Sequence, residues 1–366
     1  MISKKNTAAK PKKFLIINPF GIGDVLFTTP VVKAIKQSYP DSFIGYWSNA
    51  RVKQVVSAMP QISKVFPLSR GDLKKIFQFS FFKGVLEALN LAWQIKGGRF
   101  DVCFDFSLDY RYGLFTKLIG IKKRIGFNYK SRGKFLTHKI GLAGYSEKHV
   151  VEYYLELLKF LDIPVKDKNL ELNVTEEARV KAKNLLSSFG IFRDDLVIGI
   201  VPGAGGSWGK DAPYKHWPAL KFAQVADRLA KEKNAKILIL GDDSESEIAE
   251  VIIHIMRNKP INLVGKTGLD ILPAVIESCN LLITNDGGPM HMVVALGVKG
   301  ISVFGPVNER VYGPFPASDR HVVLKWDIEC RPCYENFRLA ACDKDRECLM
   351  SVSVDAVFEA SLKLLS

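Results

Sequence analysis

The segment Asp286–His291, with the sequence DGGPMH, constrains the fold more than any other part of this chain. An apolar, strand-like run at 280–284 precedes it, and an apolar, helix-like run at 292–296 follows it. The two glycines let backbone N–H groups approach a ligand, and the next helix presents an N-terminus, which attracts anions. Loops of this kind lie at the carboxyl edge of α/β sheets, where nucleotide phosphates bind. The segment therefore predicts either an anion site or, as the alternative, a tight buried turn.

The order of strand, glycine-containing loop and helix occurs in both halves of the chain. In the first half we expect a strand over 12–18, a loop over 19–24 and a helix over 25–38. In the second half, a strand over 196–201 leads into the glycine-rich loop 202–207. Because strands alternate with helices in each half, the pattern predicts two Rossmann-like sheets. Further strands are expected at 43–47, 100–106, 235–240, 261–264, 281–284 and 300–304, and further helices at 149–161, 176–189 and 218–233.

A length of 366 residues favours two domains. We expect a basic, disordered arm over 1–13, an N-terminal Rossmann-like domain over 14–170 and a C-terminal one over 171–350. The last segment, 351–366, is expected to form a helix, for which a return to the N-terminal domain is one alternative.

Positive charge is concentrated in the first half. Residues 1–168 contain 29 Lys and Arg against 12 Asp and Glu, a net charge of +17, whereas the remainder carries −3. Such a field attracts nucleic acid, phospholipid head groups or phosphorylated sugars. No RNA-binding or helix-turn-helix signature accompanies it, so no nucleic-acid partner is predicted. No apolar run reaches the roughly 18–20 residues of a membrane span, and the strand after the basic arm is too short for a signal-peptide core, so a cytoplasmic protein is expected.

The first glycine-containing loop, Gly21–Asp24, lies between a strand and a helix. A dinucleotide-binding fingerprint would need glycine where Leu26 stands, so an NAD site is not predicted. Asp24 has two interpretations, a general base for a hydroxyl nucleophile or a helix N-cap, and its spacing alone favours the cap.

The loop 202–207 is followed closely by Lys215. Its glycine-rich backbone could hold phosphate oxygens while the lysine neutralises their charge. The spacing is not that of a Walker loop, and a flexible surface loop is the alternative.

Three of these segments together, Gly21–Asp24, Lys215–Pro218 and Asp286–His291, resemble the family-9 glycosyltransferases, the ADP-heptose:lipopolysaccharide heptosyltransferases. Further matches are Arg124–Phe127, the helix start at His149 and Phe304–Pro306, so the resemblance covers about 14–349. It implies an α/β GT-B fold, in which two Rossmann-like domains face a central cleft. It also implies that the N-terminal domain binds the acceptor and the C-terminal domain binds the donor.

The resemblance implies an inverting transfer of heptose, or a related sugar, from a nucleotide-diphosphate sugar, with ADP-heptose expected, to a lipopolysaccharide core or similar lipid-linked glycan. Asp24 matches the family's base and Lys215 its phosphate-binding lysine. Gly287 stands where the family commonly has threonine, which removes a hydroxyl contact to the donor. Expected donor contacts are Gly203, Ala204, Gly205, Ser207, Lys215, Asp242, Glu245, Asp286, Gly287, Gly288 and His291; expected acceptor contacts are Gly21, Gly23, Lys122, Lys123, Arg124, Lys130 and Arg132. The alternatives are a GT-B sugar-nucleotide enzyme of another type, such as an epimerase, and a non-catalytic sugar-nucleotide-binding protein.

Catalysis is expected to need no metal, because no spaced carboxylate pair stands where one would be held. Four cysteines, Cys330, Cys333, Cys342 and Cys348, nevertheless have a spacing that suits a structural zinc site. Disulfides, disfavoured in a reducing cytoplasm, and free thiols are the alternatives.

Two segments of the first half combine basic and aromatic residues. The stretch 117–139 is expected to meet acceptor phosphates, acidic sugars or the inner leaflet of the cytoplasmic membrane, with a solvated loop as the alternative. The second, with Phe77, Phe79, Phe81 and Phe82, has a membrane-facing helix as one interpretation, but core packing is favoured. A peripheral protein at the inner face of the membrane is therefore expected.

Overall fold

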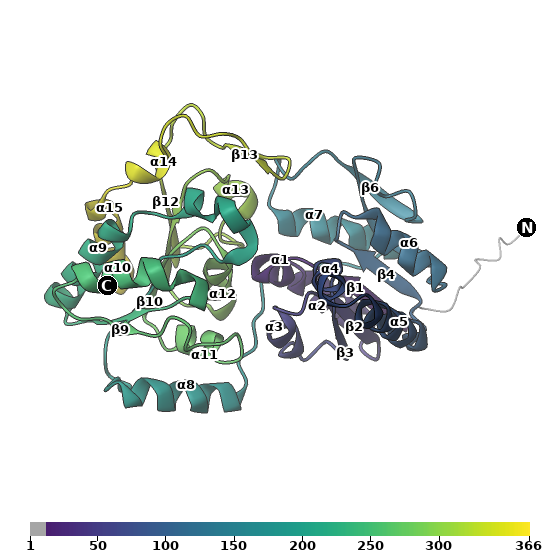
Figure 1. The fold of residues 1–366 in the computed structure, drawn as a ribbon, viewed down its shortest axis with the longest axis horizontal. Coiled ribbons are helices and arrows are strands. Elements are labelled where there is room, and N and C mark those ends of the chain that lie inside the picture. The colour runs from purple at the N-terminus through teal and green to yellow at the C-terminus, as the bar shows by residue number, and fades with distance from the viewer. Residues whose placement is uncertain (1–11) are drawn as a thin grey trace, which may run out of the picture. The chain divides into compact units, whose positions relative to one another are not determined.

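The computed structural model describes residues 12–366, except for the side chain of Ser207. Most of the basic arm expected over 1–13 lies outside this range. The chain divides into two compact units, which Figure 1 shows as ribbons. The first unit contains the chain up to Pro19 together with Val31–Leu142 and Glu156–Lys166; the second contains Phe20–Pro30, Ala143–Leu155 and Asp167–Ser366. Two segments of the N-terminal half thus belong to the second unit.

The first unit is built on a six-stranded parallel sheet in the order β3-β2-β1-β4-β5-β6. Its central strand, β1, has the sequence KFLII, and four of the five residues are buried. Such continuous apolar runs are typical of parallel strands covered on both faces. The strands are β1 Lys13–Ile17, β2 Phe43–Ser48, β3 Lys64–Pro67, β4 Val102–Asp105, β5 Lys123–Tyr129 and β6 His138–Leu142. The helices are α2 Thr29–Ser38, α3 Lys53–Ser57, α4 Arg70–Phe79, α5 Phe81–Gly98 and α6 Tyr110–Leu118, followed later by a 3₁₀ segment, Leu157–Leu161.

The second unit contains another six-stranded parallel sheet, in the order β12-β11-β10-β7-β8-β9. Its strands are β7 Val197–Val201, β8 Lys236–Ile239, β9 Ile261–Asn262, β10 Leu281–Asn285, β11 Gly300–Phe304 and β12 His321–Lys325. Its helices are α1 Ile22–Phe27, α7 Val150–Glu156, α8 Glu176–Ser188, α9 Ala219–Lys233, α10 Ser246–Ile255, α11 Leu272–Glu277, α12 Gly288–Leu296, α13 Glu309–Tyr312, α14 Glu347–Met350 and α15 Val354–Leu365. A short hairpin, β13 Tyr334–Glu335 and β14 Arg338–Leu339, and two 3₁₀ segments, η2 Gly206–Lys215 and η3 Asp243–Glu245, complete it.

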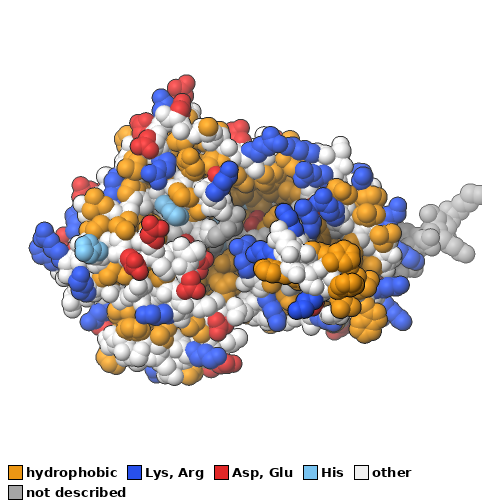
Figure 2. Space-filling view, viewed as in Figure 1, with side chains coloured by type: hydrophobic (Ala, Val, Ile, Leu, Met, Phe, Trp, Pro, Cys, Tyr) orange, Lys and Arg blue, Asp and Glu red, His pale blue; other side chains and the backbone are white. Residues whose placement is uncertain are grey.

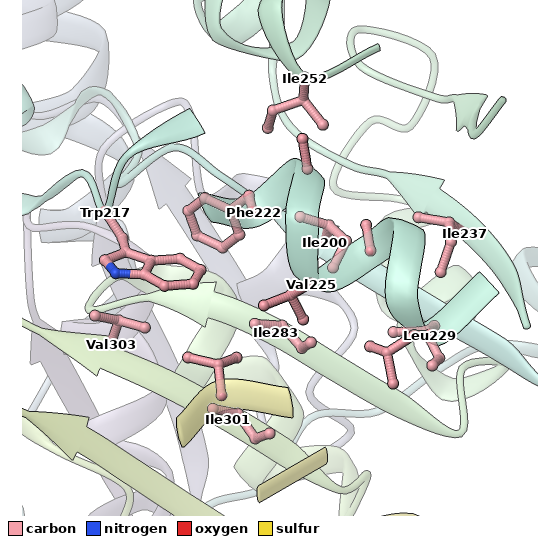
Figure 3. Close-up of a cluster of buried hydrophobic side chains, with 14 of the residues drawn as sticks. Ile200, Trp217, Phe222, Val225, Leu229, Ile237, Ile252, Ile283, Ile301 and Val303 are labelled. Atoms are coloured by element: carbon pink, nitrogen blue, oxygen red, sulfur yellow. The ribbon is translucent and has the colours of Figure 1, made fainter. Parts of the chain in front are cut away.

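The core of the second unit lies between its sheet and helix α9. Figure 3 shows Phe222, Val225 and Leu229 of α9 directed at isoleucines of β7, β8, β10 and β11, with Trp217 at one end of the cluster. Trp217 is fully buried, and its indole N–H donates to the carbonyl of Val352 at 3.1 Å. The C-terminal helix α15 packs in this unit against α9 and strands β10–β12, whereas the sequence left open a return to the N-terminal half.

The helix predicted over 25–38 is wrong as a single element, because the chain forms α1 and α2 with a break at Thr28. The hydroxyls of Thr28 and Thr29 each donate at 2.7 Å to carbonyls of the preceding turn. Threonine hydroxyls compete in this way with the backbone ladder, and Pro30 has no N–H to continue it. The proline is tolerated at the second position of α2, since first-turn N–H groups have no helical partner.

The prediction that the phenylalanines at 77–82 pack in the core is also wrong. Phe79, Phe81 and Phe82 are 93, 67 and 80% exposed, and Phe77 is 39% exposed. These side chains lie at the junction of α4 and α5.

Candidate active site

In each sheet, the direction in which successive strands are added reverses once along the chain. In the second unit, β7 is followed outward by β8 and β9, and the chain then returns to place β10 on the other side of β7. The carboxyl ends of β7 and β10 are therefore a topological switch point, where open α/β sheets bind ligands. The loops that leave these two strands are Pro202–Gly205 and Asp286–Gly287, the two loops singled out in the sequence.

Asn285 connects these loops. Its side-chain amide donates to the carbonyls of Pro202 and Gly203 at 2.6 and 3.2 Å, and its Oδ1 accepts from the N–H of Trp217 at 2.9 Å. Asn285 is fully buried, and these three bonds satisfy much of its polar capacity. Asn285 was not among the site residues expected from the sequence. The available signal was a polar amide at the end of an apolar strand, directly before Asp286.

Lys215 and Asp286 form a buried ion pair at this edge. Lys215 Nζ lies 2.6 Å from Asp286 Oδ2, and the two side chains are 7 and 5% exposed. The ammonium also lies 4.3 Å from the centre of the Trp208 ring, a cation–π contact that the sequence did not indicate. A buried charge needs such compensation, so each partner fixes the position of the other.

Asp24 lies in the first turn of α1 and belongs to the same unit. The favoured interpretation of Asp24 as an N-cap is wrong, because Gly21 occupies the cap position and Asp24 is the third residue of the helix. Asp24 is partly buried, and the resulting loss of hydration raises the pKa of its carboxyl from 3.8 to about 6. Hydrogen bonds from the backbone at Gly21 and Asp24 and the positive charge of Lys215 oppose that rise.

Small residues allow α1 to pack closely against α12. A Cβ on Gly23 would lie 2.6 Å from Cδ2 of His291, and one on Gly288 would lie 3.2 Å from Cβ of Ile22. The ring of Phe27 meets His291 edge-on, with 4.6 Å between ring centres. The close approach places Asp24 and the N-terminus of α12 in one neighbourhood.

His291 is buried, and its pKa is held well below 6.5, first by burial and then by electrostatic interaction with His149 and Lys215. The imidazole is therefore neutral at physiological pH and able to contact a ligand without adding charge. His149 also meets the Phe27 ring edge-on, with 5.1 Å between ring centres, and stacks on Phe315 at 4.5 Å. Its Nε2 lies 3.1 Å from the carbonyl oxygen of Gly313. Burial lowers the pKa of His149 to about 4.

The carboxylate of Glu245 supports the loop after β7. Its two oxygens accept from the N–H groups of Gly205 and Asp242 at 3.1 and 3.0 Å, and a Cβ on Gly203 would overlap it. Glycine at 203 is thus needed for this contact. Ala204 is buried beside the loop, and its carbonyl oxygen lies 3.2 Å from where a Cβ on Gly287 would stand. Asp242 is exposed and caps η3, and the side chain of Ser207 lies outside the described part.

The basic residues proposed for acceptor binding all lie in the first unit. Some of their side chains are bonded to main-chain carbonyls, and others are exposed. Lys123 Nζ donates to the carbonyl of Phe160 at 2.7 Å, and Arg124 donates to the carbonyls of Phe135, Ile121 and Lys122. These two side chains are committed to the main chain of their own unit. Lys122, Lys130 and Arg132 are exposed, and the last two lie over the Tyr129 ring.

The four clustered cysteines lie in the C-terminal part of the second unit. Across residues 12–366, no group of three or more His, Cys, Asp or Glu is placed to hold a metal ion, and all four are free thiols. The thiol of Cys333 donates to the carbonyl of Cys330 at 2.9 Å, and Cys342 Sγ accepts from the N–H of Arg346. Burial, reinforced by the other three cysteines, raises the pKa of the Cys333 thiol to about 11.

The family model described as glycosyltransferase family 9 (heptosyltransferase) matches residues 88–342. This chain belongs to that family. It is 28% identical over 361 residues to lipooligosaccharide heptosyltransferase 2 of Campylobacter jejuni, covering 96% of this chain and 98% of the relative. It is 24% identical over 326 residues to lipopolysaccharide heptosyltransferase 2 of Escherichia coli K12, covering 85 and 88%.

Solved structures of the family share the fold. The crystal structure of the glycosyl transferase family 9 from Veillonella parvula is 26% identical, covers 98% of both chains and has a TM-score of 0.80. The expected α/β GT-B fold with two Rossmann-like sheets is confirmed. Among the helices of residues 12–366, none combines the length and apolar character of a bilayer-spanning segment.

Proposed function

We propose that this family-9 glycosyltransferase transfers heptose from ADP-heptose, with inversion, to a lipopolysaccharide core or a similar lipid-linked glycan. Family membership and the names of the heptosyltransferase relatives support the sugar and the acceptor class. The observation that carries the mechanism is the group formed by Asp24, Lys215 and Asp286 at the switch point of the second unit.

Asp24 is the proposed base. In the transfer, the acceptor oxygen bonds to the anomeric carbon while the bond from that carbon to the diphosphate breaks, and the acceptor proton passes to the Asp24 carboxylate. A base works best when its pKa lies near the working pH, and a carboxyl with a pKa of about 6 is ionised at pH 7.5 yet more basic than an ordinary aspartate.

Lys215 and the N-terminus of α12 are the proposed stabilisers of the departing diphosphate. The first-turn N–H groups of α12 have no helical partner, so the helix N-terminus can hold an anion. The ion pair with Asp286 holds the Lys215 ammonium in place before the donor arrives. Such preorganised charge favours the transition state, in which negative charge accumulates on the leaving group. The other loop residues, Gly203–Gly205, Asp242, Glu245 and His291, are proposed as donor contacts.

Catalysis is proposed to be independent of divalent metal, since one ammonium and a helix terminus serve the diphosphate. Full activity after chelation with EDTA is the expected result, and restoration by added Mg²⁺ alone would contradict it. Lys122, Lys130 and Arg132, which are exposed and basic, are proposed to meet anionic groups of the acceptor. The enzyme is proposed to work at the inner face of the cytoplasmic membrane, where a positively charged first half would be attracted to anionic lipids.

The decisive experiment measures ADP release from ADP-heptose with and without a lipid-linked acceptor. Release that requires acceptor, and that is lost in Asp24→Asn, supports transfer. Acceptor-independent conversion of the donor would favour an epimerase or related enzyme, and tight donor binding without any turnover would favour a binding protein.

A further inference from the structure

Helix α5 has two apolar faces, and the core of its unit uses one of them. On the inner face, Leu91 and Ile95 are 6 and 1% exposed and join the hydrophobic cluster beneath the sheet. On the opposite face stand Phe82, Leu86, Leu89 and Trp93, which are 80, 65, 62 and 77% exposed. Their spacing of four, three and four residues places them in one stripe along the helix. The core of this unit does not cover this second apolar stripe, which is left exposed.

The preceding helix extends this stripe into a surface. Phe79 and Phe81 are exposed beside Phe82, and Phe77, Phe81 and Phe82 form a chain of ring contacts of 5.9 and 6.1 Å. A Cβ on Gly84 would overlap the Phe77 ring, so glycine at this position lets α4 and α5 pack together. The exposed aromatic residues therefore lie on a packed helical hairpin, residues 70–98, rather than on a loose loop.

Basic side chains accompany the hairpin. Residues 70–99 contain two acidic residues, Asp72 and Glu87, and six basic ones: Arg70, Lys74, Lys75, Lys83, Lys96 and Arg99. All six basic residues are exposed, whereas Asp72 is occupied as the capping partner of Ser69. Figure 2 shows a broad hydrophobic patch with Lys and Arg side chains beside it, over the region where Figure 1 places α4 and α5.

A cavity of about 760 Å³ lies at the C-terminal end of this surface, with Trp93 in its lining. Lys96, Arg99 and Lys122 also line it, against a single acid, Asp101. Asp101 Oδ2 already accepts from the backbone N–H groups of Lys12 and Lys13. The excess of positive charge suits the phosphate of a lipid head group.

We propose that the α4–α5 hairpin is the surface by which this enzyme docks on a bilayer of anionic phospholipid. Aromatic and leucine side chains enter the boundary between head groups and acyl chains, while the surrounding lysines and arginines contact lipid phosphates. The inference rests on the proposed function only in that a lipid-linked acceptor gives the enzyme a reason to lie at a membrane. A second copy of the chain is a poorer occupant, because a symmetric interface would bring the same six cations face to face.

The test measures co-sedimentation of the full-length protein with vesicles of phosphatidylethanolamine and phosphatidylglycerol, and with vesicles of phosphatidylcholine. We expect binding to the anionic vesicles that weakens with salt. The double variant Phe82→Ser, Trp93→Ser should reduce the vesicle partition coefficient by roughly tenfold or more, since two large apolar side chains no longer enter the bilayer. A charge variant, Lys83→Glu with Lys96→Glu, should lose the preference for anionic vesicles. This variant tests the proposal independently if the apolar variant folds poorly.

Matched controls lie in the second unit. Phe192→Ser removes an aromatic side chain that is 67% exposed, and Lys231→Glu with Lys233→Glu reverses two exposed charges on α9. Both controls should bind vesicles as the unmodified protein does. Tryptophan fluorescence gives a second reading, because a blue shift on vesicle binding should disappear in Trp93→Phe while sedimentation persists.

Unaltered vesicle binding in both hairpin variants, or no binding by the unmodified protein, would overturn the proposal. A change of molecular mass in the hairpin variants, with no vesicle binding, would instead assign the surface to self-association. Transfer to a detergent-dispersed acceptor separates this inference from the proposed function. An enzyme that transfers heptose but ignores vesicles refutes the docking surface alone, and one that binds vesicles without transferring refutes the proposed function alone.

Discussion

Replacing Asp24 by asparagine should stabilise the protein at pH 7.5 while removing transfer. Folding raises the pKa of this carboxyl from 3.8 to about 6, so keeping it ionised in the folded state costs at most about 3 kcal/mol at neutral pH. Asp24 keeps some contact with solvent, which reduces the cost of its charge, and asparagine loses the attraction to Lys215. Both effects reduce the gain in stability from the substitution. We expect the free energy of unfolding to rise by about 1–2 kcal/mol and the melting temperature by a few degrees.

The sign of the pH dependence makes this prediction specific. Because the folded-state pKa lies above the unfolded one, the destabilisation is absent below about pH 4, develops between pH 4 and 6, and is constant above pH 6. The advantage of Asp24→Asn should therefore be largest at pH 7–8, fall to about half at pH 5 and nearly vanish at pH 4.

Thermal melting of both proteins at several pH values measures the stability difference, and ADP release with matched donor and acceptor measures transfer. General-base catalysis is typically worth about 10²–10⁴-fold in rate, and donor affinity should be kept. A stability difference that does not change between pH 4 and 8 would refute the raised pKa. Near-normal turnover in the variant would refute the role as base, and Asp105 or His291 would be the next residue to test.

Three further substitutions or conditions test the site. The value of kcat/KM should fall about tenfold for each pH unit below about 6, as Asp24 becomes protonated, and a rate profile that stays flat to pH 5 would contradict this. Lys215→Ala should weaken ADP binding by about 10–150-fold in isothermal titration, through loss of a charged contact worth about 1.5–3 kcal/mol, whereas Lys210→Ala, on the exposed part of the same segment, should bind normally. Gly23→Ala places a Cβ 2.6 Å from an imidazole carbon and should destabilise the protein by about 1–3 kcal/mol, whereas Gly97→Ala, with nothing within 4 Å, should melt unchanged or higher.

The sequence predicts the parts of this fold that local chemistry determines. The strand-to-helix transition at 286–291 follows from an apolar run, two glycines and a second apolar run, and the structure ends β10 at Asn285 and begins α12 at Gly288. The strand β5 was missed because its sequence, KRIGFNY, begins with two basic residues and has the composition of a solvated loop. Its basic side chains are retained by main-chain carbonyls that only the folded unit supplies.

The residue types at the site could be predicted from the sequence, but the neighbouring residues that hold them in place could not. Lys215 and Asp286 were expected near phosphate, but their mutual ion pair depends on tertiary structure. The same holds for Asn285, which accepts from the N–H of Trp217, and for Trp208, whose ring centre lies 4.7 Å from that of Tyr334. The phenylalanines at 77–82 were wrongly expected in the core, because the sequence alone does not show which side of a helix the core will cover.

The assignment of α1 to the second unit has a consequence for hybrid enzymes. A fusion of two relatives at a linear boundary near residue 170 would combine Asp24, the proposed base, from one parent with the proposed donor loop 286–291 from the other. The two would then meet through a glycine and a histidine of different ancestry, because Gly23 of α1 lies against His291 of α12. The two parents should therefore carry compatible residues at positions 23 and 291, whatever the lengths of their chains. A hybrid that keeps Phe20–Pro30 with the C-terminal parent would inherit an intact site and change the remainder of the N-terminal half around it.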